Sequence, residues 1–322
     1  MGEFDLIARH FKRPVKHAVL GGGDDCALIA PTAGMQLAIS SDMLVEGRHF
    51  LSTVDPARLG HKALAVNLSD LAACGARPVA FTLALSLPRA DDAWLERFAQ
   101  GLYALADTHG CELIGGDTTQ GPLNLCITVF GEVPAGQALL RSGARAGDDI
   151  YVSGTLGAAR AALEVFRGTL SLPEPALAVA RERMEQPTPR VALGQALRGI
   201  ASAALDLSDG LLGDLGHVLA ASRVGARIEA ERVLGCFGLR DAGPLPALGE
   251  SQRLECVMAG GDDYELAFTA PPQARAAVEA AARAASTPVQ RIGRIEAEAG
   301  LRVVQADGTP LAQRFQSFDH FA

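Results

Sequence analysis

The stretch Lys62-Ala-Leu-Ala-Val-Asn-Leu-Ser-Asp-Leu-Ala-Ala-Cys-Gly-Ala76 decides how the first half of the chain folds. Its leucines recur at helical spacing, so we expect a helix that starts near residue 55 and buries this side. Asn67 and Asp70 lie three residues apart on a different side of the helix, which groups their polar atoms. Pro78 is expected to end the helix before a buried strand over residues 80–87.

The same patterns extend outward in both directions. Helical spacing predicts further helices over residues 5–13, 91–108, from 208 onward and over 274–285. Apolar runs predict strands over residues 26–29, 37–40, 112–115, 124–133 and 150–153. Helices alternate with strands that look antiparallel, so we predict an α+β fold instead of a doubly wound sheet.

The chain is long enough for two domains. It has 322 residues, which exceeds what one hydrophobic core usually supports. A charged, glycine-rich segment over residues 141–149 separates two apolar strands, and such segments are typical of domain boundaries. We therefore predict an amino-terminal domain over residues 1–140 and a carboxy-terminal domain over residues 141–322.

Composition excludes several classes of protein. The net charge of −8 disfavours nucleic acid and anionic membrane surfaces as partners. No apolar stretch approaches the roughly 20 residues that span a bilayer, and no signal peptide is visible at the start. The six cysteines form no CxxC pair, so we interpret them as reduced core thiols. These features predict a cytoplasmic protein.

Acidic residues among small residues are the chemical signature of this chain. Six segments share the pattern: Gly23-Asp24-Asp25, Ser40-Ser41-Asp42, Asn67-Leu68-Ser69-Asp70, Gly115-Gly116-Asp117, Asp206-Leu207-Ser208-Asp209 and Gly260-Gly261-Asp262-Asp263. Several follow apolar runs, so we expect them at strand ends, where carboxylates converge. Converging carboxylates repel one another unless cations lie between them. Oxygen ligands without paired His or Cys indicate Mg²⁺, usually completed by substrate phosphates.

Each segment taken alone has a simpler interpretation, because Asp in such a setting is usually a turn or a helix cap. Their joint occurrence favours a shared metal site. The chain has no P-loop, no protein-kinase signature, no zinc spacing and no nucleophile elbow. Phosphate chemistry would then depend on metals and on helix N-termini. Ser208 is expected to cap a helix and to present its first N–H groups to a phosphate, although a plain cap remains the alternative.

Eight stretches taken together resemble the thiamine-monophosphate kinase family. They are Gly23–Ala27, Ser41–Asp42 with Val45–Phe50, Lys62–Ala76, Leu113–Thr119, Arg141–Ala144, Ala204–Leu211, Gly260–Leu266 and Phe318–Phe321. The resemblance runs through essentially the whole chain in order. It implies an aminoimidazole-ribonucleotide-synthetase-like fold of two α/β domains, in a homodimer whose amino-terminal strands build a shared barrel. The amino-terminal domain would bind ATP and Mg²⁺ and dimerise, and the carboxy-terminal tail would close the substrate pocket.

The resemblance also implies an activity and its residues. The activity is transfer of the γ-phosphate of ATP to thiamine monophosphate, giving thiamine diphosphate, with several Mg²⁺ ions. The implied magnesium ligands are Asp25, Ser40, Ser41, Asp42, Asp70, Asp117, Asp206 and Asp209. Asp42, Asp70, Asp117 and Asp209 would carry catalysis. The nucleotide would contact Gly116, Asp117, Arg141 and Ser208, and the thiamine phosphate would contact His49, Asp262 and Phe318.

Three positions depart from the family pattern. Asp262 replaces a common Glu, Ser41 replaces a frequent Thr, and His109 stands where an aromatic residue often precedes the nucleotide motif. Other functions also remain open. An ATP-dependent synthetase of the same fold, for aminoimidazole ribonucleotide or selenophosphate, is the nearest alternative. A non-catalytic nucleotide-binding homologue and a metal-dependent phosphatase are the others.

Overall fold

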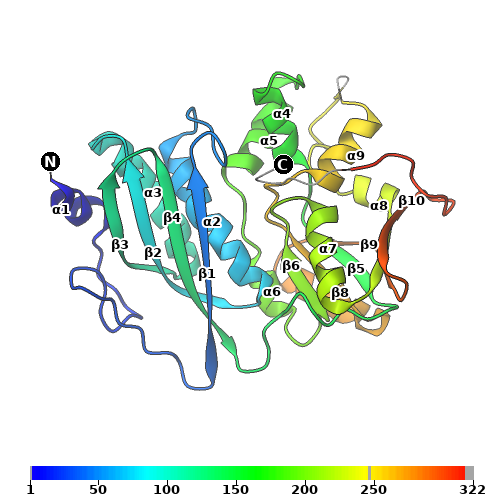
Figure 1. The fold of residues 1–322 in the computed structure, drawn as a ribbon, viewed down its shortest axis with the longest axis horizontal. Helices are drawn as coiled ribbons and strands as arrows, with labels where there is room; N and C mark the ends of the chain where they lie inside the picture. The colour runs from blue at the N-terminus through cyan, green and yellow to red at the C-terminus, as the bar shows by residue number, and fades with distance from the viewer. Residues whose placement is uncertain (1, 246–247, 316–322) are drawn as a thin grey trace. The chain divides into compact units, whose positions relative to one another are not determined.

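The computed structural model describes residues 2–245 and 248–315 of the chain. The chain divides into two compact units, which we treat separately. The amino-terminal unit comprises Met1–Leu71 and Ala76–Gly136, and the carboxy-terminal unit comprises Ala72–Gly75 and Gln137–Ala322. Each unit has its own β-sheet (Figure 1).

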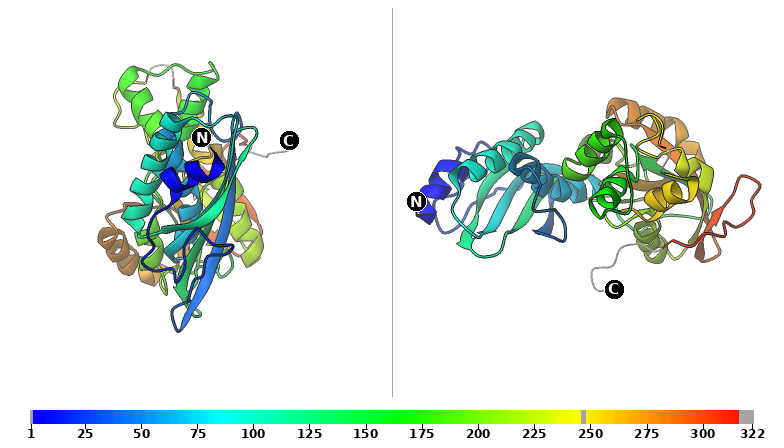
Figure 2. Two further views of the ribbon diagram at one scale, coloured as in Figure 1. Left: turned by 90° about the vertical axis from the view of Figure 1, so that its left-hand side faces the viewer. Right: turned by 90° about the horizontal axis from the view of Figure 1, so that it is seen from above.

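The amino-terminal unit is a four-stranded sheet with helices on one face. Its strands are β1 (Met35–Val45), β2 (Arg77–Leu87), β3 (Glu112–Gln120) and β4 (Asn124–Pro134), in the order β1-β4-β2-β3. β4 is antiparallel to both neighbours, whereas β2 and β3 are parallel. Helices α2 (Pro56–Ala73) and α3 (Asp92–His109) cover one face of the sheet in both views of Figure 2.

Local sequence explains the helices of this unit. Asp91 caps α3 by accepting a hydrogen bond from the N–H of Trp94, and Gly110 ends it in the left-handed conformation. Leu95, Phe98 and Leu102 face inward and are fully buried. Helix α2 ends at Ala73, before Gly75, so Pro78 does not end it as predicted; Pro78 already belongs to β2.

Strand β1 presents an apolar face to solvent. Its side chains alternate between the helix-covered face and the opposite face, as expected for a strand. Leu37, Ile39, Met43 and Val45 lie on the opposite face and are between 37% and 60% exposed. Among the described strands β1 pairs only with β4, so its other edge is open. An open apolar edge is a site where another chain can add.

The segment before β1 is mostly irregular. After α1 (Glu3–Leu6) and the π-helix Ile7–Phe11, the chain runs without a strand to Met35. The strand predicted over residues 26–29 is wrong, because the segment makes only an isolated bridge between Leu20 and Leu28. In Figure 1 this dark-blue trace passes below the sheet before it enters β1.

The carboxy-terminal unit has a six-stranded mixed sheet. Its strands are β5 (Asp149–Ser153), β6 (Ala203–Asp206), β7 (Gly225–Glu229), β8 (Leu266–Ala270), β9 (Val289–Glu296) and β10 (Gly300–Val304), in the order β10-β7-β9-β5-β8-β6. Its helices are α4 (Ala158–Phe166), α5 (Glu174–Glu185), α6 (Val191–Ala196), α7 (Leu211–Ser222), α8 (Ala230–Leu234), α9 (Glu250–Ala259) and α10 (Arg275–Ala284), with a 3₁₀ turn at Pro272–Ala274. Helix α7 packs on β6 and α9.

The predicted α+β class is confirmed, with corrections of detail. Asp206 ends its strand as predicted, but Asp42 and Asp117 lie inside β1 and β3, because apolar and β-branched residues continue both strands. Three cysteines, Cys111, Cys236 and Cys256, are buried, whereas Cys26 is exposed and is not a core thiol. Within the part of the chain that the structure describes, no helix combines the length and apolarity needed to cross a membrane.

Candidate active site

Strand β1 and helix α2 bring four polar residues together. Ser40 and Asp42 lie on the same face of β1, because side chains two residues apart point the same way. The Ser40 hydroxyl donates to Oδ2 of Asp70 on α2. The backbone N–H of Asp42 donates to Oδ1 of Asn67, 3.1 Å away, and Asn67 is itself fixed by Nδ2 donating to the Ala63 carbonyl. The Ser-Ser-Asp and Asn-Leu-Ser-Asp segments therefore lie side by side within this unit.

Ser41 points to the other face of the sheet. Its hydroxyl lies 3.0 Å from the Thr128 hydroxyl and donates to the Ile127 carbonyl at 3.2 Å. The side chain is thus already engaged on β4, away from Ser40 and Asp42. If Ser41 binds a cation beside Asp42, its backbone carbonyl is the atom available.

Gly116 and Asp117 lie at the opposite edge of the same sheet. Across the strands Asp42 aligns with Ile127, Leu83 and Gly116 in one row. Three strand spacings of about 4.8 Å put Gly116 about 14 Å from Asp42. Asp117 is one residue further and points to the opposite face from Asp42. Only glycine fits at 116, because a Cβ there would lie 1.9 Å from the Leu83 carbonyl oxygen.

Asp25 is exposed in the glycine-rich loop before β1. Its N–H donates to Oδ1 of Asp24 at 2.8 Å. The loop runs beside β3: a Cβ on Gly22 would lie 3.6 Å from the Ile114 carbonyl oxygen and 3.8 Å from the Gly115 Cα. Within this unit the Gly-Asp-Asp loop therefore neighbours the Gly-Gly-Asp motif of β3.

In the carboxy-terminal unit the end of β6 lies beside the Gly-Gly-Asp-Asp segment. The N–H of Asp262 donates to the Ser208 carbonyl, and the N–H of Tyr264 donates to the Leu207 carbonyl, both at 2.8 Å. The approach is tight enough that a Cβ on Gly261 would lie 2.4 Å from the Ser208 carbonyl oxygen. Two predicted site segments, from distant parts of the sequence, are adjacent here.

Asp214 shapes the loop that carries Ser208 and Asp209. Its Oδ2 accepts hydrogen bonds from the N–H groups of Ser208, Asp209 and Gly210, at 3.0 to 3.1 Å. Burial raises the pKa of Asp214 to about 6, although the backbone donors oppose this. Helix α7 begins only at Leu211. The predicted cap by Ser208 is therefore wrong, and the N–H groups of this loop are taken by Asp214, a side chain from the first turn of α7.

Asp262 is held in an unusual conformation. Asp262 and Tyr264 have positive φ angles of 66° and 49°, which non-glycine residues rarely adopt. The Tyr264 hydroxyl donates to Oδ1 of Asp262 at 3.2 Å. Local strain of this kind concentrates at functional sites, where the surroundings hold it. The short carboxylate that departs from the family pattern is thus oriented by its neighbour two residues on.

The remaining predicted residues have separate surroundings. His49 accepts a hydrogen bond at Nδ1 from the N–H of Val45, at 3.0 Å, so its Nε2 carries the proton when the ring is neutral. Arg141 is exposed, and its carbonyl accepts from Ser222. Burial and the neighbouring His61 lower the pKa of His109. Phe318 lies outside the described residues.

The donor set suits a hard cation. Around Ser40, Asp42 and Asp70 the side-chain donors are oxygens, the atoms that Mg²⁺ prefers. Among the described residues no group of three His, Cys, Asp or Glu side chains is placed to hold a metal by itself. Two carboxylates with a nearby hydroxyl fit a Mg²⁺ ion, which usually takes its remaining ligands from water and substrate phosphates.

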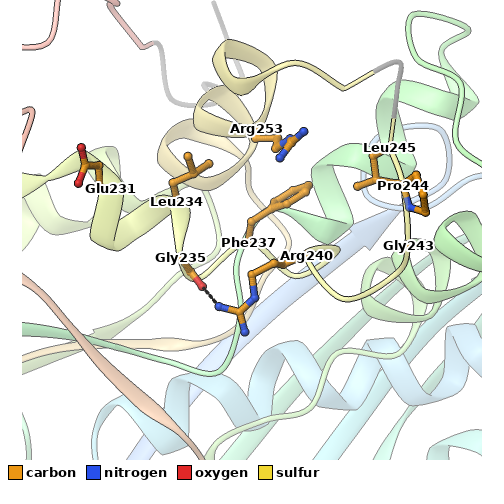
Figure 3. Close-up of a pocket in the computed structure, with 9 residues that line it drawn as sticks. All are labelled: Glu231, Leu234, Gly235, Phe237, Arg240, Gly243, Pro244, Leu245 and Arg253. Atoms are coloured by element: carbon orange, nitrogen blue, oxygen red, sulfur yellow. Dashed lines mark hydrogen bonds between the residues drawn. The ribbon is translucent and has the colours of Figure 1, made fainter.

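A separate hollow lies in the carboxy-terminal unit (Figure 3). It encloses about 450 Å³ and is lined by Glu231, Leu234, Gly235, Phe237, Arg240, Gly243, Pro244, Leu245 and Arg253. Its two cations are engaged: Arg240 donates to the Gly235 carbonyl and Arg253 to the Leu248 carbonyl. None of the described site residues lines it. We therefore keep the aspartate segments as the candidate site.

Comparison with known proteins identifies the class. The model of the AIR synthase related protein, N-terminal domain, matches residues 23–133, and that of the C-terminal domain matches residues 145–305. The chain therefore belongs to the AIR synthase related family, with its α+β fold.

Within the AIR synthase related family, the full-length relatives of this chain are thiamine-monophosphate kinases. The chain is 47% identical over 327 residues to the thiamine-monophosphate kinase of Salmonella typhimurium, covering 100% of this chain and 98% of the relative. A crystal structure of the kinase from Stenotrophomonas maltophilia is 46% identical, with a TM-score of 0.83 over 96% of each chain. A second structure, described as AaThiL complexed with AMPPCP and TMP, is 29% identical, with a TM-score of 0.74 over 91% and 89% of the two chains.

Sequence reasoning did not assign a role to three residues that shape the site. Asn67 was visible as a helix neighbour of Asp70, but not as an acceptor for Asp42. Asp214 offered only its place in the first turn of a helix. Tyr264 gave no signal, because its bond to Asp262 depends on two positive φ angles that side-chain periodicity does not reveal.

Proposed function

We propose that this protein transfers the γ-phosphate of ATP to thiamine monophosphate, forming thiamine diphosphate and ADP. The observation that carries this proposal is the full-length match, at 47% identity, to a thiamine-monophosphate kinase. The related structure with AMPPCP and TMP supports the same pair of substrates.

The reaction needs no catalytic base. The acceptor is a phosphate monoester whose second pKa is about 6, so it is mostly ionised at neutral pH. The lack of a base agrees with the surroundings of His49: its Nδ1 already accepts a hydrogen bond from the Val45 N–H, so this nitrogen is not available to accept a proton from the substrate. In this proposal His49 contacts the acceptor phosphate and orients it. The transfer proceeds by direct in-line attack, without a phosphoenzyme.

The main obstacle is repulsion between two polyanions and the carboxylates around them. Bound Mg²⁺ would supply the positive charge that offsets this repulsion. The residues that would hold the several Mg²⁺ ions are Asp25, Ser40, Ser41, Asp42, Asp70, Asp117, Asp206 and Asp209. Gly116, Asp117, Arg141 and Ser208 would bind the nucleotide. Ser208 would do so through its hydroxyl, because the N–H groups of Ser208, Asp209 and Gly210 already donate to Asp214. Asp262 and Phe318 would complete the thiamine pocket.

A homodimer would complete the site. Asp42 and Asp117 lie at opposite edges of one sheet, about 14 Å apart by strand spacing, and so cannot share an ion within the chain. If a second copy places its β3 edge beside the open edge of β1, the partner subunit's Asp117 comes next to Ser41 and Asp42. The exposed apolar side chains of β1, Leu37, Ile39, Met43 and Val45, would then line a closed barrel. We propose this shared barrel, and a cytoplasmic location for the dimer.

One assay tests the function. The full-length protein is incubated with Mg-ATP and thiamine monophosphate, and thiamine diphosphate and ADP are measured together. We expect them in equal amounts. Release of inorganic phosphate without thiamine diphosphate would indicate a phosphatase or synthetase instead. A protein-bound γ-phosphate label during turnover would contradict direct transfer.

A further inference from the structure

The loop that carries Asp24 and Asp25 has almost no regular structure of its own. Its base closes where the N–H of Val19 donates to the Leu28 carbonyl and the N–H of Leu28 donates to the Leu20 carbonyl, at 2.8 and 2.9 Å. The seven residues between Leu20 and Leu28 include three consecutive glycines. Glycines leave the chain many conformations, so something outside the loop must fix where Asp25 lies.

The carboxylate of Glu112, the first residue of β3, binds the backbone of residues 16–18, which lie just before this loop. Its Oε1 accepts from the N–H of Lys16 at 2.6 Å and of His17 at 3.2 Å. Its Oε2 accepts from the N–H of His17 at 3.1 Å and of Ala18 at 3.2 Å. One carboxylate thus binds three consecutive backbone amides that would otherwise have no strand to pair with.

A second carboxylate holds the other side of the loop. Glu132 on β4 accepts from the N–H and the hydroxyl of Thr32, at 2.7 and 2.9 Å, and is paired with Arg77 at 2.7 Å. Along the same segment Val15, Ala18, Ala27 and Ile29 pack on the buried cluster of Val79, Ala80 and Ile114. The loop is therefore tied at both ends to the sheet that bears Asp117.

We propose that Glu112 is a positioning residue for the metal site: it fixes the glycine-rich loop against β3 so that Asp25 is presented beside Gly116 and Asp117. The inference rests on the proposed role of Asp25 as a magnesium ligand. In this role Glu112 would act on the metal site through the loop, by binding the amides of residues 16–18.

The charge of Glu112 suits this task. Burial raises its pKa, but the backbone donors of Lys16, His17 and Ala18 outweigh it, so the pKa lies below its usual value. An ionised carboxylate offers acceptors only, and hydrogen bonds to it are about twice as strong as neutral ones. In a glutamine of the same shape, one of the two groups facing the amides would become an NH₂ donor. Glu112→Gln should therefore release part of the anchor without creating a cavity.

The test compares four full-length variants in the kinase assay at varied Mg²⁺. For Glu112→Gln we expect the Mg²⁺ concentration at half-maximal rate to rise about 10-fold, as for other residues that orient ligands. The KM for thiamine monophosphate and the rate at saturating Mg²⁺ should stay near the parent values. Glu112→Asp keeps the charge, so its Mg²⁺ concentration at half-maximal rate should lie between the values of the parent and of Glu112→Gln. Glu96→Gln, at an exposed site on α3, is the matched control and should behave like the parent. Asp25→Asn removes the proposed ligand directly and should show the largest rise.

Amide hydrogen exchange gives a second readout. In Glu112→Gln, exchange should accelerate at residues 16–18. If it does so while the Mg²⁺ requirement is unchanged, Glu112 is only a structural anchor and the inference is overturned. If Asp25→Asn also leaves the Mg²⁺ requirement unchanged, the metal role of Asp25 in the proposed function fails as well. If the Mg²⁺ requirement rises for Asp25→Asn but not for Glu112→Gln, the positioning role of Glu112 is overturned and the proposed function is unaffected.

Discussion

Removal of the buried charge on Glu265 is the sharpest test of how the carboxy-terminal unit is held together. The Glu265 side chain is fully buried. It accepts from Arg190 Nε at 2.6 Å, from Arg183 Nη2 at 2.7 Å and from the Ser153 hydroxyl at 2.6 Å. Its carbonyl also accepts from the N–H of Leu207, which joins β8 to the loop after β6.

In Glu265→Gln two arginines lose their counter-charge, and a new NH₂ group faces one of them. Breaking a buried, hydrogen-bonded ion pair by removing one partner costs about 3–5 kcal/mol. For a unit of this size that corresponds to a fall in Tm of about 10 °C. The matched control is Glu279→Gln, whose partner Arg283 lies 3.9 Å away and is 73% exposed. An exposed pair of this kind contributes less than about 1 kcal/mol.

Thermal unfolding of the full chain, followed by circular dichroism, measures both changes under one condition. We expect a large fall in Tm for Glu265→Gln and almost none for Glu279→Gln. Equal, small shifts for the two variants would refute the claim that buried Glu265 balances the half-buried cations Arg183 and Arg190. Kinase activity below the lowered Tm should also fall, because the Glu265 segment supports the loop of Ser208 and Asp209.

Four shorter predictions concern the site. Burial raises the pKa of Asp214 to about 6, so its stabilising contribution is present below about pH 4 and is lost as pH rises through 6. In urea titrations the parent should therefore lose up to about 3 kcal/mol of unfolding free energy between pH 4 and 7 that Asp214→Asn does not lose. A difference between the two proteins that does not change with pH would contradict this. Asp42→Asn should lower kcat at least about 100-fold with an unchanged Tm, and a Tm loss that Mg²⁺ does not explain would make Asp42 structural. His49→Ala should raise the KM for thiamine monophosphate about 10-fold more than the KM for ATP, and equal rises would count against its assignment. Ile39→Lys should convert a dimer to a monomer in sedimentation, and an unchanged mass would exclude β1 from the interface.

Local patterns in the sequence were enough to predict much of the fold. The helix predicted over residues 91–108 is α3 (Asp92–His109), because its apolar residues repeat at helical spacing and Asp91 can cap it. The Asn-Leu-Ser-Asp segment was expected to present polar atoms from a helix, and Asp70 does so toward Ser40. Short-range periodicity and capping determine these features.

Other features depend on pairings between distant residues. Nothing in the sequence near Asp117 indicates that β4 and β2 lie between β3 and β1. The positions of Asp42 on β1 and Asp117 on β3, at opposite edges of the sheet, could therefore not be predicted from the sequence. The three amides held by Glu112 lie more than 90 residues away from it. The start of α7 at Leu211 follows from the bonds that Asp214 makes with the preceding loop, which helical spacing does not reveal.

Mixing two inactive variants tests the shared metal site most directly. Asp42→Asn and Asp117→Asn are each expected to be inactive as homodimers. When they are unfolded, mixed and refolded together, half of the dimers should carry one of each chain. In such a heterodimer one site has both substitutions and the other has both aspartates, so about a quarter of the parent activity should return. If mass analysis shows that heterodimers form and thiamine diphosphate is still not made, the aspartates do not act across the dimer.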